Sequence, residues 1–245
     1  MISRCHVAIR LPWRIHAASS PLVNFSKLNS GTLTPLPDPL VCTTPRLSTE
    51  IILIVSDSWT IHGLWPDYCD GTYPQFCDKS REYSDIKSIV SKFLGNATLS
   101  YMDKYWVSQD GDDESFWEHE WDKHGTCIST LEPSCYSGYK SGEEAADYIK
   151  KTISLFKELP TYKWLAEAGI EPSDEKTYTY EEIEDALAGQ HGARVTIGCK
   201  GKTLSEVWYH FNVKGSLQEG EFVAAEPDGS KGSCPDSGIK YAPKN

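Results

Sequence analysis

The stretch Phe116-Trp-Glu-His-Glu-Trp-Asp-Lys-His-Gly-Thr-Cys127 places two histidines, one lysine and three acids within twelve residues. Ser115 and Glu118 form a capping-box pattern, which predicts a helix beginning at Ser115. Successive helical residues advance by about 100°, so four functional side chains fall within about 140° of one side. These are His119, Glu120, Lys123 and His124. We expect one helix face to carry them, with Gly125 ending the helix and Cys127 placed to anchor it.

Two other readings of this run are open. A zinc protease helix carries His-Glu-x-x-His, with the histidines four residues apart. Here His119 and His124 are five apart and Lys123 would repel a cation, so we expect neither a metal nor a cofactor. The alternative for the run taken alone is a solvated, charged helix face.

A second motif, Trp59-Thr-Ile-His-Gly-Leu-Trp-Pro66, favours the catalytic reading. It begins with strand composition, and we expect it to break at Gly63 and Pro66. A lone histidine such as His62 is usually a core residue, but two imidazoles together suit acid–base catalysis near their pKa of about 6.5. RNA cleavage needs this combination: a base for the 2′-OH, an acid for the leaving oxygen, and a cation beside the phosphate.

Composition limits the remaining possibilities. The chain has 245 residues with 39% hydrophobic residues, as globular proteins do, and its longest strongly apolar run, Ile51–Val55, is too short to span a membrane. The net charge of −11 argues against a non-specific nucleic-acid binder, so any RNA chemistry must be local. Eight cysteines without a Cys-x-x-Cys pair favour disulfides in an oxidising compartment.

The chain changes character near residue 57. Residues 1–57 are rich in Ser, Thr and Pro, and we expect them to be an atypical, poorly ordered segment, with Ile51–Val55 as a possible buried strand. Met1–Ser20 lacks the apolar centre of a signal peptide. Residues 58–245 predict one α+β domain. Its helices are expected at 84–94, 97–106, 141–159 and 179–189, the last two opened by capping boxes, and its later strands at 195–199 and 205–213.

Together, the two motifs resemble the active-site segments of the ribonuclease T2 family. The resemblance runs over about 57–245 and is similar to the fungal secreted members at 71–73, 112–117 and 211–215. It implies a central antiparallel sheet flanked by helices and stapled by disulfides. It also implies a monomeric endoribonuclease that cleaves single-stranded RNA through a 2′,3′-cyclic phosphate to 3′-phosphate ends, with low base specificity. The alternative is a non-catalytic secreted protein that keeps this fold for binding or defence.

The resemblance also implies individual roles. His124 would be the general base and His62 the general acid, with Glu120, Lys123 and His119 around the phosphate. The base 5′ to the cut would be held by Trp65, Asp67, Tyr73 and Phe116. Ser108 and Gln109 are weaker candidates for a second base site.

Disulfide pairing and location follow from the same resemblance. It implies the bridges Cys77–Cys127 and Cys199–Cys234, and leaves open the pairing of Cys5, Cys42, Cys69 and Cys135. The sequons at Asn24 and Asn96 fit a secreted or vacuolar glycoprotein, and we expect Asn96 to be glycosylated. The segment before Ser58 does not match the family, so we expect either a gene-model artefact or a true variant there.

Overall fold

The computed structural model describes residues 7–14, 57–68, 72–227, 229 and 232–244. No helix among them is both long enough and apolar enough to cross a membrane. The expected strand at 51–55, the sequon at Asn24 and three of the eight cysteines (Cys5, Cys42 and Cys69) lie outside these residues.

The sheet is built around two long neighbours, β1 (Val7–Arg14) and β6 (Thr203–Lys214), which pair antiparallel along the whole of β1. The other edge of β1 pairs with β2 (Thr60–Ile61) and β3 (Trp65–Asp67). The remaining strands extend the sheet from β6: β5 (Thr196–Lys200), β7 (Glu221–Ala224), β8 (Ile239–Lys240) and, beyond β8, β4 (Thr177–Tyr178). The pairs are antiparallel except for one parallel pairing of β6 with β8.

Strand β1 differs from the expectation that residues 1–57 are poorly ordered. Apolar residues alternate at Val7, Ile9, Leu11 and Trp13, a period of two that is typical of a strand. Pairing with β3 and β6, which follow it by more than 50 and 190 residues, defines its place.

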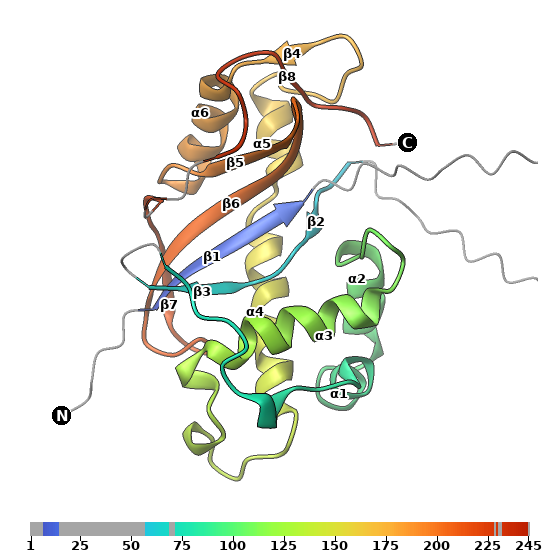
Figure 1. Cartoon of the computed structure of the whole chain (residues 1–245), viewed down its shortest axis with the longest axis vertical. Coiled ribbons are helices and arrows are strands. Elements are labelled where there is room, and N and C mark those ends of the chain that lie inside the picture. The colour runs from blue at the N-terminus through green and yellow to red at the C-terminus, as the bar shows by residue number, and fades with distance from the viewer. Residues whose placement is uncertain (1–6, 15–56, 69–71, 228, 230–231, 245) are drawn as a thin grey trace, which may run out of the picture.

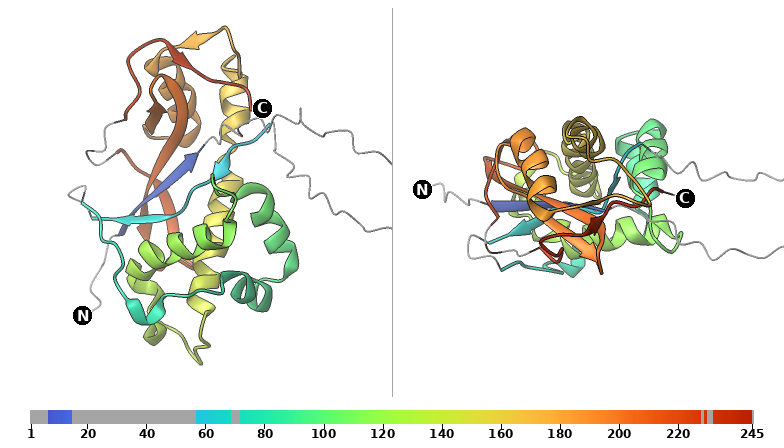
Figure 2. Two further views of the ribbon diagram at one scale, coloured as in Figure 1. Left: turned by 45° about the vertical axis from the view of Figure 1, so that its right-hand side comes forward. Right: turned by 90° about the horizontal axis from the view of Figure 1, so that it is seen from above.

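The helices form two groups. They are α1 (Ile86–Phe93), α2 (Asn96–Tyr105), α3 (Asp113–Lys123), α4 (Glu143–Glu158), α5 (Thr161–Glu167) and α6 (Tyr180–His191), with short 3-10 turns at Lys79–Arg81, Gly125–Cys127, Ser129–Leu131 and Pro133–Cys135. Helices α4, α5 and α6 cover one face of the sheet, whereas α1, α2 and α3 gather beside β2 and β3 (Figures 1 and 2).

Two predicted helix starts are wrong. Helix α3 begins at Asp113, because the Asp112 carboxylate accepts a hydrogen bond from the Ser115 amide and acts as the cap in place of Ser115. Helix α4 is preceded by Gly142 in the left-handed region (φ 90°), without a side-chain cap from Ser141. The Glu144 carboxylate of that predicted box is instead buried and accepts from two tyrosine hydroxyls.

Other boundaries are partly confirmed. The predicted capping box of α6 is present in full between Thr179 and Glu182, but the helix continues past Gly189 to His191, where Gly192 (φ 90°) caps it. Pro66 lies within β3 and does not end it, since β3 is an edge strand, where proline is tolerated. The apolar face predicted for α4 is buried as expected: Ala145, Tyr148, Ile149, Ile153 and Phe156.

Tryptophans near the site combine core packing with backbone hydrogen bonds. The indole N–H of Trp106 donates to the carbonyl of His62 at 2.9 Å. The indole N–H of Trp117 donates in turn to the carbonyl of Trp106 at 2.7 Å. All three residues are buried, so the backbone of His62 is fixed from the helical side of the molecule.

The Tyr148 hydroxyl of α4 links both sequence motifs. It accepts a hydrogen bond from the Leu64 amide at 3.2 Å and donates toward the carbonyls of Leu64 (3.0 Å) and Glu120 (3.3 Å). Leu64 follows His62 by two residues, and Glu120 belongs to α3. One fully buried phenol therefore sets the spacing of the two motifs.

The two disulfides implied by the resemblance are present. Cys77 is bonded to Cys127 and Cys199 to Cys234, while Cys135 is a free, exposed thiol.

We predict that Tyr148→Phe lowers the free energy of unfolding by about 1–3 kcal/mol, because the buried Leu64 amide loses its side-chain partner. Denaturant unfolding measures this. Tyr162→Phe is the matched control, since no hydrogen bond of its hydroxyl is present in the described structure, and it should change stability little. Equal stability of the two variants would contradict this role of Tyr148.

Candidate active site

His62 and Glu120 meet in a buried site between the β2–β3 segment and α3. His62 Nε2 lies 3.5 Å from Glu120 Oε1, and both side chains are almost fully buried. The other carboxylate oxygen, Oε2, accepts a hydrogen bond from the indole N–H of Trp65 at 2.7 Å. Trp65 thus orients the Glu120 carboxylate, which faces His62.

Gly63 permits this close approach. A Cβ atom at this position would lie 1.9 Å from Glu120 Oε2 and 2.8 Å from Glu120 Cδ. Any larger residue would displace the carboxylate, so the glycine that the sequence suggests as a strand breaker is required by the site.

His124 packs against the ring of Trp65. The imidazole and indole rings stack with centroids 4.6 Å apart and planes 16° apart. Neither ring nitrogen of His124 has a hydrogen-bond partner among the described residues. Burial, and then the charges of Lys123 and His119, lowers the pKa of His124 to about 3. The imidazole is therefore neutral in mild acid, and its one unprotonated ring nitrogen can accept a proton.

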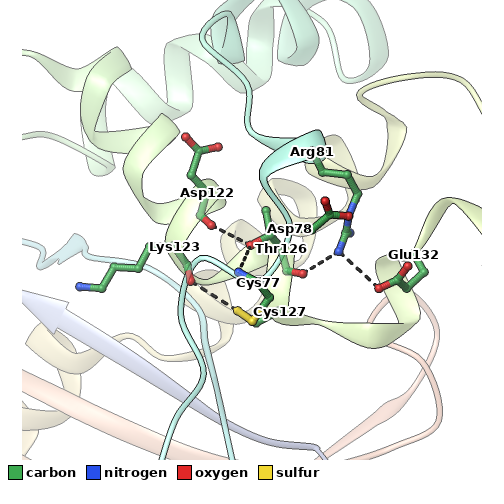
Figure 3. The surroundings of a disulfide bond; sticks show 8 residues. All are labelled: Cys77, Asp78, Arg81, Asp122, Lys123, Thr126, Cys127 and Glu132. Carbon is green, nitrogen blue, oxygen red and sulfur yellow. Dashed lines mark hydrogen bonds and ion pairs between the residues drawn. A yellow bond between two sulfur atoms is a disulfide. The ribbon is translucent and has the colours of Figure 1, made fainter.

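His119 and Lys123 have more open surroundings. His119 is exposed, although burial, followed by the charge of Lys123, lowers its pKa. The half-buried Lys123 extends its side chain away from the Cys77–Cys127 bridge (Figure 3). The predicted single patch is thus divided: Glu120 and His124 are buried beside Trp65, whereas His119 is on the solvent side.

The four predicted base-binding residues differ in exposure. Phe116 is half-buried with its ring centroid 5.6 Å from that of His62. Trp65 is also half-buried, and its ring additionally packs against Trp208 at 5.8 Å. Asp67 is 4% exposed, whereas Tyr73 is 56% exposed. Of the weaker candidates, Ser108 donates its amide to Asp113, and Gln109 is exposed.

A disulfide and hydrogen bonds hold the loop at residues 72–81 against the C-terminal end of α3 (Figure 3). Besides the Cys77–Cys127 bridge, the Cys77 amide donates to the Thr126 hydroxyl at 3.2 Å, and that hydroxyl donates to the Asp122 carbonyl. The buried Arg81 donates to the Thr126 carbonyl at 2.6 Å and to the Asp78 carboxylate at 2.8 Å. This network holds the segment after Tyr73 against the helix that carries Lys123.

Four residues that contact the site or its supporting backbone were not predicted from the sequence: Arg81, Trp106, Tyr148 and Trp208. Each is distant in sequence from the residue that it contacts, and no local pattern marks it: Arg81 bonds Thr126, Trp106 bonds His62, Tyr148 bonds Glu120 and Trp208 packs on Trp65. As for metals, the described residues contain no group of three or more His, Cys, Asp or Glu side chains arranged to hold an ion.

Comparison with known proteins adds independent findings. The model of the ribonuclease T2 family matches residues 39–221. Ribonuclease Trv of Hypocrea rufa is 64% identical over 189 residues, which are 77% of this chain and 80% of that protein. Ribonuclease T2 of Aspergillus oryzae is 56% identical over 190 residues, covering 77% of this chain and 68% of the relative.

One solved structure has a similar fold. The crystal structure of Actibind, described as a T2 ribonuclease, matches with a TM-score of 0.81 and 44% identity, covering 97% of this chain and 88% of that one. The family model spans most of the sequence, and in both relatives more than half of the aligned residues are identical, so this chain belongs to the ribonuclease T2 family.

Proposed function

We propose that this protein is a metal-independent endoribonuclease that cleaves single-stranded RNA by transesterification. The product would be a 2′,3′-cyclic phosphate that is then hydrolysed to a 3′-phosphate. The observation that carries the proposal is the buried group in which Trp65 contacts Glu120, His62 and His124 at once. Two imidazoles in different electrostatic surroundings suit one acid and one base.

His124 acts as the base. A general base must be unprotonated at the working pH, and the low pKa of His124 meets this condition in mild acid. It removes the proton of the 2′-OH, whose oxygen then attacks the adjacent phosphorus.

His62 acts as the acid. Its Nε2 faces the Glu120 carboxylate, whose negative charge stabilises a protonated imidazole. It gives its proton to the 5′ oxygen as the P–O bond breaks. Glu120 and Lys123 stabilise the pentacovalent phosphate, and His119 contacts the phosphate.

Base recognition would rest on Trp65, Tyr73 and Phe116, with Asp67 accepting a hydrogen bond from an exocyclic amine. Aromatic faces stack on any base, so specificity is low. The chain would act as a monomer and follow the secretory route. Its two disulfides and the exposed Asn96 of an Asn-x-Thr sequon support this route.

A non-catalytic binding or defence protein of the same fold is the weaker alternative. It has no need of an oriented carboxylate between an imidazole and an indole, nor of the buried His124, whose ring nitrogens bond to no residue that the structure describes. Cleavage of RNA by the purified protein separates the two readings.

We predict that His124→Ala lowers kcat/KM for RNA by at least about 10²–10⁴-fold, because the base is lost. His62→Ala should do nearly the same on RNA, but cost less on a substrate with a good leaving group, which needs less help from an acid. Steady-state kinetics on both substrates test this. Equal losses for His62→Ala on the two substrates would argue against its role as the acid.

The activity should have a bell-shaped pH profile with its maximum on the acid side. Because burial and Lys123 lower the pKa of His124, we expect the acidic limb of kcat/KM well below pH 6.5. In Lys123→Met the like charge is gone, the pKa of His124 rises, and the limb should move to higher pH as activity falls. The control Lys163→Met, at an exposed ion pair with Glu167, should leave the limb in place. A maximum above about pH 7.5, or an unmoved limb in Lys123→Met, would count against this assignment.

Activity should also be independent of metal ions, since the proposed steps use only imidazoles, a carboxylate and an ammonium. We expect full cleavage of RNA in excess EDTA, with RNA cleavage by the untreated protein as the control. Loss of activity on chelation and its return with zinc would refute the mechanism.

A further inference from the structure

Phe76 has an unusual backbone conformation. Its φ angle is 50°, and no other non-glycine residue in the described part of the chain has a positive φ. Left-handed backbone is unfavourable for a bulky side chain, and such residues persist only where the surroundings hold them.

The surroundings of Phe76 do hold it. Its own amide donates to the Lys123 carbonyl at 2.9 Å. The next residue, Cys77, forms the disulfide to Cys127 and donates its amide to Thr126. Three links thus fix the backbone at the end of α3, beside Lys123.

This fixed backbone does not serve to bury the side chain. The Phe76 side chain is 48% exposed and is not part of the hydrophobic core. It meets the His119 imidazole edge to face, with centroids 6.1 Å apart and planes 76° apart. Tyr73, three residues earlier in the same loop, is also an exposed aromatic side chain.

We propose that Phe76 is a nucleobase-stacking residue, which adds a contact to single-stranded RNA beyond the base adjacent to the cut. The proposal rests on the ribonuclease function proposed above. The exposed Phe76 ring meets the His119 imidazole and offers a stacking surface for a base, and its backbone amide is bonded to the carbonyl of Lys123, the lysine that the proposed mechanism places at the phosphate. Such a contact is worth roughly ten-fold in affinity.

Glycine separates this role from a structural one. Phe76→Gly removes the ring and at the same time relieves the unfavourable φ angle. We expect its melting temperature to equal or exceed that of the wild type, while KM for an RNA oligonucleotide rises about ten-fold at nearly unchanged kcat. The Kd of an uncleavable 2′-O-methyl oligonucleotide should rise by the same factor, and KM for a dinucleotide should change little.

Two matched variants complete the test. Phe76→Trp keeps a stacking surface and should retain the wild-type KM, whereas Phe76→Leu covers His119 without an aromatic face and should behave as Phe76→Gly does. Wild-type KM in Phe76→Gly, or full rescue by Phe76→Leu, would overturn the stacking role while leaving the ribonuclease function intact. A wild-type protein that cleaves no RNA would overturn the proposed function, and this inference with it.

Discussion

The architecture of the site depends on the Tyr148 hydroxyl. This buried group contacts Leu64 and Glu120, one from each sequence motif, at distances of 3.0–3.3 Å. The phenol comes from α4, which belongs to neither motif, and both halves of the site are positioned relative to that helix. Because the β2–β3 segment has few strand pairs of its own, its position relative to α3 comes from side-chain hydrogen bonds of this kind.

The second constraint is desolvation. His62, Glu120 and His124 are all nearly excluded from water, so each charge there depends on a specific neighbour. Glu120 has the indole N–H of Trp65 and faces His62, whereas His124 has only an aromatic ring and nearby positive charges. The Glu120 carboxylate therefore faces the His62 imidazole, whereas burial and the nearby positive charges keep the His124 imidazole neutral. An acid–base pair follows from the asymmetry of the surroundings.

The third constraint is the attachment of the loop 72–81 to the end of α3. A disulfide, the Thr126 hydroxyl and the Arg81 guanidinium all act within this short region. The result is an aromatic loop held next to Lys123 on a molecule whose net charge is −11. In such a protein an anionic substrate is attracted locally, and uncharged stacking surfaces supply affinity that does not depend on the overall field.

The sequence by itself determined the α+β class, the two motifs with His62, Glu120 and His124, the capping box of α6 and the buried face of α4, because all are local patterns of spacing and composition. It misplaced the starts of α3 and α4, where a nearby aspartate or glycine competes with the predicted cap. Three features follow only from the three-dimensional structure: β1 joins the sheet, Trp65 contacts both Glu120 and His124, and Tyr148 and Arg81 support the site. These contacts join residues from 28 to roughly 200 positions apart. The free energy of such contacts depends on burial and geometry that no local window of sequence contains.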